Sequence, residues 1–114
     1  MIDDDGPILA LMRNLLKEFG YRAVTAADGR NAIAEAQQQS PALVLLDKNM
    51  PGMSAGEVIR ELRSQPGLET VPVLMLTGER LSRSELASLG ANGALLKPFD
   101  VPDLLEQIRH HLPL

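Results

Sequence analysis

The sequence contains no cysteine and very few aromatic residues. The absence of cysteine excludes a disulfide framework, a thiolate nucleophile and a zinc–sulfur site. Apart from histidine, the only aromatic residues are Phe19, Tyr21 and Phe99. The core must therefore be aliphatic, and a nucleic-acid surface built on stacked rings is not expected.

Basic residues and long hydrophobic runs are also scarce. Lys and Arg number 11 against 15 Asp and Glu, which gives a formal net charge of −4. Because a protein that binds a phosphate backbone is expected to be basic, direct nucleic-acid binding is not expected. No run approaches the roughly 18 apolar residues of a membrane span, and the acidic N-terminus has no targeting pattern. We therefore expect a soluble, cytoplasmic protein without membrane contact.

The length and composition indicate one domain over residues 1–114. The hydrophobic fraction is 45% and the charged fraction 23%, as in an ordinary globular domain. Folding at this length buries roughly 60–70% of the surface of the unfolded chain, which is enough for one core.

Helix-like and strand-like segments alternate along the chain. In the first predicted helix, one face carries Ile8, Met12, Leu15, Leu16 and Phe19, and we expect this face to point inward. Strands are predicted at residues 21–26, 43–46, 71–76 and 94–96, and helices at 5–20, 30–38, 54–65, 82–90 and 101–112.

This alternation predicts an α/β fold in which a doubly wound parallel sheet carries helices on both faces. The run Leu43-Val44-Leu45-Leu46 has no polar alternation, which is typical of a parallel strand covered on both sides. The pattern requires a further strand before the first helix, but only Met1 and Ile2 precede the acidic residues. We expect this first strand to be truncated, with unpaired neighbours, which allows a homodimer formed by edge pairing.

Polar residues follow the predicted strands at the edge where ligand sites form in such sheets. Clustered carboxylate oxygens favour Mg²⁺, and lysine and threonine can bind phosphate oxygens. A carboxylate beside a metal and a lysine can act as a nucleophile toward a phosphoryl group. The residues therefore suggest an Mg²⁺-assisted aspartyl phosphorylation site. Its members are Asp3, Asp4, Asp5, Asp47, Thr77 and Lys97.

Four segments, in this order and spacing, resemble bacterial two-component response-regulator receiver domains, chemotaxis regulators in particular. The resemblance covers essentially the whole chain and implies a flavodoxin-like, five-stranded parallel sheet with strand order 2-1-3-4-5. The segments are Asp3-Asp4-Asp5, Leu46-Asp47-Lys48-Asn49-Met50-Pro51-Gly52-Met53, Leu76-Thr77-Gly78 and Leu96-Lys97-Pro98-Phe99.

The resemblance also implies a role for each matching residue. Asp47 would be the phosphoacceptor, and Thr77 and Lys97 would bind phosphoryl oxygens. The Mg²⁺ ligands would be Asp3 (mainly through water), Asp4, Asp47 and the backbone carbonyl of Asn49, and Lys97-Pro98 would be a cis peptide bond. The donor would be a histidine kinase or a histidine phosphotransfer protein, and a downstream protein would receive the signal. The chain would catalyse only its own phosphorylation and dephosphorylation.

Two alternatives stay open. An Mg²⁺-dependent phosphohydrolase with an aspartyl nucleophile would need a second Asp two residues after the first, where this chain has Asn49, whose amide does not exchange a proton near neutrality. A degenerate receiver could act only as a scaffold, although Asp4, Asp47, Thr77 and Lys97 are all present.

One position departs from the family pattern. Ala94 occupies the place where most receivers carry an aromatic ring that changes rotamer on phosphorylation. Alanine has no χ angle, so a signal cannot pass through a ring at this position.

Overall fold

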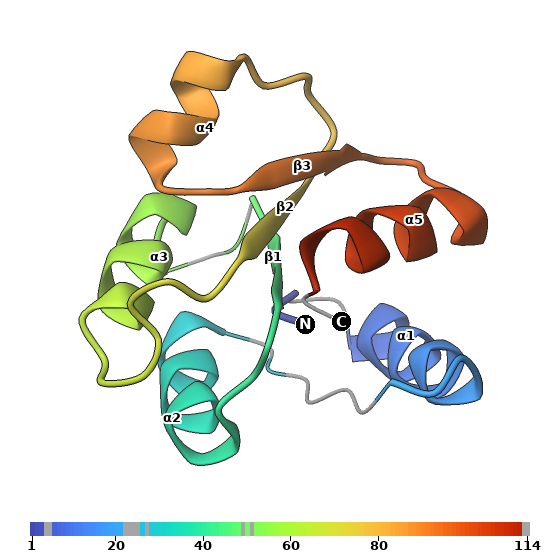
Figure 1. Ribbon diagram of the computed structural model, residues 1–114, viewed down its shortest axis with the longest axis horizontal. Helices are drawn as coiled ribbons and strands as arrows, with labels where there is room; N and C mark the ends of the chain where they lie inside the picture. Colours follow the sequence, from blue (N-terminus) through green and yellow to red (C-terminus); the bar gives the residue numbers. More distant parts are fainter. Residues whose placement is uncertain (4–5, 22–25, 27, 49, 51, 113–114) are drawn as a thin grey trace.

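The fold is described from a computed structural model that covers all residues except 4–5, 22–25, 27, 49, 51 and 113–114 (Figure 1). The predicted helices are all present, as are the strands expected near residues 43, 71 and 94. The strand predicted at residues 21–26 lies largely outside the described residues. In chain order the elements are α1 (Gly6–Glu18), α2 (Gly29–Gln39), β1 (Val44–Asp47), α3 (Ala55–Arg63), β2 (Val73–Thr77), α4 (Arg83–Leu89), β3 (Gly93–Leu96) and α5 (Val101–His111).

The described strands form a parallel sheet in the order β1-β2-β3. Ile2 extends it through isolated parallel bridges to Leu46 and to Ala26. The N–H of Ile2 donates to the Leu45 carbonyl over 2.7 Å, and the Asp47 N–H donates to the Ile2 carbonyl over 2.9 Å. Ile2 therefore lies between Ala26 and β1. Since the described ladder has three strands, the five-strand order stays a prediction.

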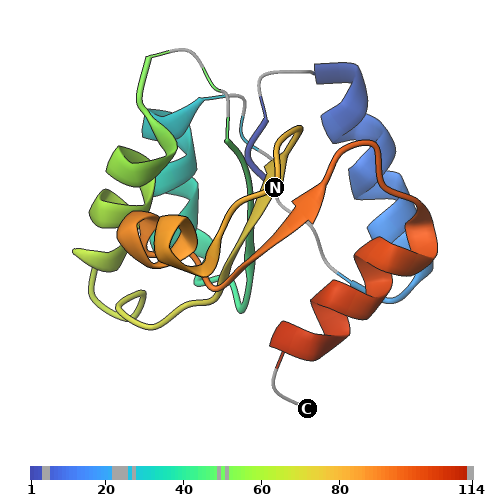
Figure 2. The same cartoon turned by 90° about the horizontal axis from the view of Figure 1, so that it is seen from above.

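Helices cover both faces of the sheet, with α1 and α5 on one side and α2, α3 and α4 on the other (Figures 1 and 2). Every residue of β1 and β2 is buried, as expected of strands covered on both faces. Side chains that alternate along the strands enter two separate apolar clusters. Leu45, Leu74 and Leu76 pack toward α1 and α5, whereas Val44, Leu46, Val73 and Met75 pack toward α2 and α3.

The expected inward face of α1 is confirmed for Met12 and Leu16, but it is wrong for Phe19, which is 47% exposed. The helix ends at Glu18, and Gly20 adopts a φ of +86°, which turns the chain away. The Tyr21 N–H then donates to the Leu16 carbonyl over 2.9 Å. Phe19 consequently lies beyond the helical periodicity that would have placed it in the core.

Side-chain caps set the starts of the other helices. Ser54 and Ser82 each form a capping box, with Glu57 and Glu85 respectively. Ser82 is therefore the N-cap of α4. At the far end of α3, the Arg63 guanidinium donates to four acceptors in the segments before β2 and β3. They are the carbonyls of Val71 and Gly90, both at 2.8 Å, Asn92 Oδ1 at 3.1 Å and the Glu69 carbonyl at 3.3 Å. None of the helices in the described part of the chain is long and apolar enough to cross a bilayer.

β2 contributes fully buried side chains to both apolar clusters, so shortening one of these side chains should be costly. We expect Leu74→Ala to lower the free energy of unfolding by about 2–5 kcal/mol, because Leu74 is fully buried. Leu11→Ala makes the same chemical change at a 66% exposed position of α1 and should shift it by less than about 0.5 kcal/mol. Urea unfolding of both variants measures the difference, and equal effects would contradict the assignment of the core.

Candidate functional site

The carboxyl ends of the strands carry three of the residues singled out from the sequence. Asp47 and Thr77 are the last residues of β1 and β2, and Lys97 follows β3. The Lys97 N–H donates to the Thr77 carbonyl over 2.7 Å, and the Asp47 N–H donates to the carbonyl of Ile2, which directly precedes Asp3. Backbone pairing thus brings Asp3, Asp47, Thr77 and Lys97 to one edge of the sheet.

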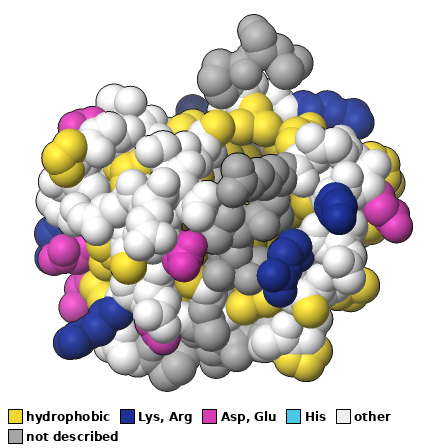
Figure 3. All heavy atoms as spheres, turned by 90° about the horizontal axis from the view of Figure 1, so that it is seen from below, with side chains coloured by type: hydrophobic (Ala, Val, Ile, Leu, Met, Phe, Trp, Pro, Cys, Tyr) yellow, Lys and Arg dark blue, Asp and Glu magenta, His cyan; other side chains and the backbone are white. Residues whose placement is uncertain are grey.

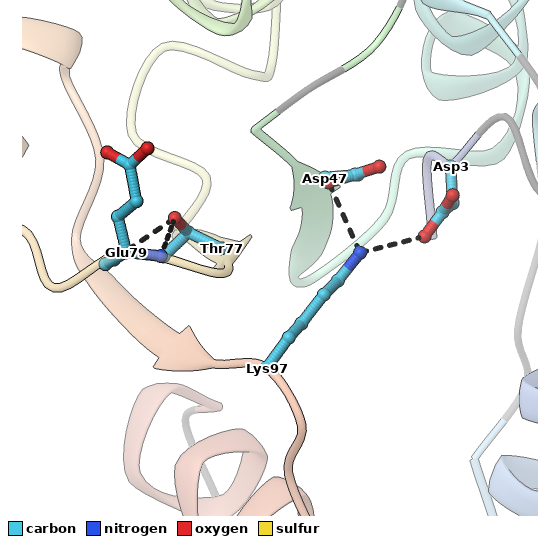
Figure 4. A network of polar contacts seen from close by, with 5 residues as sticks. All are labelled: Asp3, Asp47, Thr77, Glu79 and Lys97. Carbon is cyan, nitrogen blue, oxygen red and sulfur yellow. Dashed lines mark hydrogen bonds and ion pairs between the residues drawn. The ribbon is translucent and has the colours of Figure 1, made fainter.

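The Lys97 ammonium lies between two carboxylates (Figure 4). Its Nζ is 3.2 Å from Asp47 Oδ1 and 3.5 Å from Asp3 Oδ2. Both aspartates are buried, at 2% exposure for Asp3 and 6% for Asp47. Since a buried carboxylate is costly unless it is paired and hydrogen-bonded, the ammonium offsets the repulsion and desolvation that the two acids introduce.

These contacts determine the protonation of Lys97. Burial acts to lower its pKa, but the hydrogen bond to Asp47 and the negative charges of Asp3 and Asp47 outweigh burial and raise the pKa above its ordinary value. The interaction therefore stabilises the folded state below the pKa of lysine in the unfolded chain and is lost as the pH rises through the raised value. Lys97 is a permanent cation at neutral pH.

Thr77 is buried at the same edge, but its hydroxyl is engaged elsewhere. Thr77 Oγ1 accepts a hydrogen bond from the Glu79 N–H over 3.0 Å and donates to the Glu79 carbonyl over 3.1 Å. In Figure 4 this pair lies apart from the Lys97 cluster. The structure therefore places Asp3, Asp47 and Lys97 in direct contact and Thr77 beside them, bound into the turn that follows β2.

The remaining predicted metal ligands, Asp4 and Asn49, lie outside the described residues. Within the described part of the chain, no three His, Cys, Asp or Glu side chains gather in a way that could hold a metal ion. Asp3 and Asp47 nevertheless fit Mg²⁺, because this ion commonly takes one or two carboxylates and keeps several waters. An oxygen of each carboxylate already contacts a cation, the Lys97 ammonium.

Two further features surround the site. The Lys97-Pro98 peptide bond is cis, as the resemblance to receivers implies. Lys48, the residue after Asp47, forms an ion pair with Glu79 at 3.6 Å between Nζ and Oε2. Sequence reasoning missed this pair, because the only signal was the position of Lys48 beside Asp47, and nothing in the sequence connects it with the turn after β2.

The response regulator receiver domain model matches residues 1–109. The chain belongs to this family. It is 39% identical over 113 residues to TcrX of Mycobacterium tuberculosis, a probable transcriptional regulatory protein, with 96% of this chain and 47% of TcrX covered. It is 32% identical over 111 residues to the phosphate regulon transcriptional regulatory protein PhoB of Rhizobium meliloti, with 96% and 49% covered. The chain thus spans about half the length of these relatives.

Solved structures of receivers are similar over nearly the whole chain. The chemotaxis protein CheY4 of Vibrio cholerae superposes with a TM-score of 0.91 at 36% identity, covering 97% of this chain and 94% of CheY4. The receiver domain of the sensor histidine kinase PA1611 from Pseudomonas aeruginosa superposes with a TM-score of 0.83 at 28% identity, covering 96% and 93%. That structure has a magnesium ion coordinated in its active site cleft.

The turn held by Thr77 can be tested directly. We expect Thr77→Val to increase the exchange rate of the Glu79 amide proton by about five- to tenfold, because valine keeps the shape but removes the hydroxyl that accepts from this N–H. Thr77→Ser retains the hydroxyl and serves as the control, with a rate close to that of the unmodified chain. Hydrogen exchange followed by NMR measures both, and an unchanged rate in Thr77→Val would show that the bond does not hold the turn.

Proposed function

We propose that this chain accepts a phosphoryl group on Asp47 from the phosphohistidine of a histidine kinase or a phosphotransfer protein. The observation that carries the proposal is the position of the Lys97 ammonium, 3.2 Å from Asp47 and 3.5 Å from Asp3, in a chain of the receiver family. Asp47 lies at the end of β1, where a donor can approach the open edge of the sheet.

In the proposed step, an oxygen of the Asp47 carboxylate attacks the phosphorus atom of the donor. The new P–O bond forms as the P–N bond to the imidazole breaks, and the imidazole leaves with its proton. The product on Asp47 is an acyl phosphate. Lys97 offsets the charge of Asp47 before the transfer, and its three N–H donors suit the phosphoryl oxygens afterwards.

Magnesium is part of the proposal. Asp3 and Asp47 would hold the ion, together with Asp4 and the Asn49 carbonyl that the resemblance to receivers implies. When bound, Mg²⁺ would neutralise charge on the phosphoryl oxygens during transfer. The PA1611 receiver, which has magnesium in its cleft, supports this assignment.

Thr77 would bind a phosphoryl oxygen once its hydroxyl breaks its hydrogen bonds with the backbone of Glu79.

The proposal includes a five-stranded sheet with the order 2-1-3-4-5. The parallel bridges of Ile2 to Ala26 and Leu46 support that order. We place the chain in the cytoplasm, where receivers meet their kinases, and infer that its phosphorylated form binds a downstream protein.

The proposal predicts a single, metal-dependent phosphorylation. Incubation with acetyl phosphate and Mg²⁺ should add one phosphoryl group, detected as a mass increase of the intact chain. Asp47→Asn should abolish labelling, because an amide is a poor nucleophile, and excess chelator should suppress it. Labelling that persists in Asp47→Asn, or that proceeds equally with chelator, would refute the proposal.

Matched variants separate the roles of the neighbours. Lys97→Met removes the cation but keeps the length of the side chain, and it should retain Mg²⁺ binding while losing the response to the phosphoryl group. Asp4→Ala should reduce labelling by weakening Mg²⁺ binding. Unfolding curves of each variant provide the control that lost labelling is not lost folding.

A second prediction concerns the conformational response. Ala94 is only partly buried and has no ring to move, so phosphorylation should alter the turn at Thr77–Glu79 more than the surface around Ala94. Amide hydrogen exchange with and without beryllofluoride, a phosphoryl mimic, compares the two regions. Larger protection changes near Ala94 than near Thr77 would contradict this prediction.

A further inference from the structure

The hydroxyl proton of Thr77 at the end of β2 has two competing acceptors. Thr77 Oγ1 donates this proton to the Glu79 carbonyl over 3.1 Å and accepts from the Glu79 N–H over 3.0 Å. A threonine hydroxyl carries a single O–H donor. A phosphoryl oxygen on Asp47 can therefore accept this hydrogen bond only if the Glu79 carbonyl loses it. An interaction that holds Glu79 in place consequently favours the turn over the phosphoryl group.

The Glu79 side chain ties this turn to the end of β1. Figure 4 shows the Thr77 hydroxyl against the Glu79 backbone, with the Glu79 carboxylate directed away from it. Glu79 Oε2 lies 3.6 Å from Lys48 Nζ. Within the described part of the chain, the Glu79 carboxylate forms no other ion pair or hydrogen bond.

Lys48 extends from the sheet itself, directly after Asp47. Its N–H donates to the Leu76 carbonyl over 2.9 Å, which continues the pairing of β1 with β2 by one residue. Its side chain is partly buried, whereas that of Glu79 is exposed. A cation fixed beside Asp47 thus restrains a glutamate that belongs to the turn.

Nearby charges dominate the field at Glu79. Lys97, the other cation of the site, already contacts Asp3 and Asp47. Basic and acidic side chains are interspersed over the face seen from below (Figure 3). Exposed charges more than about 8–10 Å apart are largely screened at physiological salt. Among the described cations, Lys48 therefore acts most strongly on the Glu79 carboxylate.

We propose that the Lys48–Glu79 ion pair holds the turn after β2 in the arrangement that occupies the Thr77 hydroxyl, so that Lys48 and Glu79 are positioning residues that oppose phosphoryl binding. The inference rests on the proposed function, in which Asp47 carries the phosphoryl group. Breaking the ion pair frees the turn and makes the Thr77 hydroxyl easier to transfer to a phosphoryl oxygen.

The test compares the affinities of Lys48→Met and the unmodified chain for beryllofluoride in the presence of Mg²⁺. Loss of the ion pair should raise the affinity about two- to fivefold, the range that an exposed ion pair supports. A direct effect of charge has the opposite sign, because removing a cation beside Asp47 disfavours an anion. Lys48→Arg retains the ion pair and should bind like the unmodified chain. Unchanged or weaker binding by Lys48→Met would overturn the proposal.

Two further variants trace the effect through the turn. In a Thr77→Val background, the gain from Lys48→Met should vanish, because no hydroxyl is left to release. A gain that persists there would overturn the proposal. Arg80→Met removes a cation from an exposed position next to Glu79 that forms no ion pair within the described chain, and it should not raise the affinity. An equal gain in Arg80→Met would also overturn the proposal.

Hydrogen exchange of the chain without ligand gives an independent measurement, which decides alone if Thr77→Val does not fold or bind. Lys48→Met should speed exchange of the Glu79 amide proton about two- to fivefold, whereas Lys48→Arg and Arg80→Met should leave it unchanged. An unchanged rate in Lys48→Met would overturn the proposal. If no variant binds beryllofluoride, the proposed function fails and the inference fails with it. If the unmodified chain binds and Lys48→Met binds no more tightly, the inference alone fails.

Discussion

Parallel pairing of β1 and β2 constrains every other part of the molecule, because both strands are buried on both faces and a slip of one residue would exchange those faces. The register pairs Asp47 with Leu76 and Thr77 with Leu96, so the last residues of neighbouring strands are brought together by hydrogen bonds in the core. Asp47 and Thr77 are thus positioned by strands that are among the most deeply buried elements of the described chain.

The electrostatics of the site follow from that placement. The bridge between Ile2 and Leu46 brings Asp3 to the edge where Asp47 ends β1. Both carboxylates are buried there, so the fold needs a counter-charge. Lys97 supplies this charge from the end of β3, the strand whose Leu96 is 39% exposed. The arrangement therefore places a partly exposed cation beside two buried carboxylates.

Much of this architecture follows from periodicity and from the rule that sites form at the carboxyl ends of parallel strands. That rule alone predicts that Asp3, Asp47 and Lys97 share one edge. The exposure of Phe19 could not be predicted, since it depends on a local turn at Gly20 that ends α1 at Glu18, before Phe19. The Lys48–Glu79 pair and the contacts of Arg63 join segments far apart in the chain, and no periodic pattern reports such contacts. The roles of Asp4 and Asn49 still rest on resemblance.

The Arg63 guanidinium also has a consequence for the way the chain opens. Its hydrogen bonds to the Val71 and Gly90 carbonyls and to Asn92 Oδ1 tie the end of α3 to the segments that precede β2 and β3. Neither segment can separate from α3 without breaking bonds to a charged donor. Local unfolding should therefore release α3 and these two segments together, as one cooperative unit.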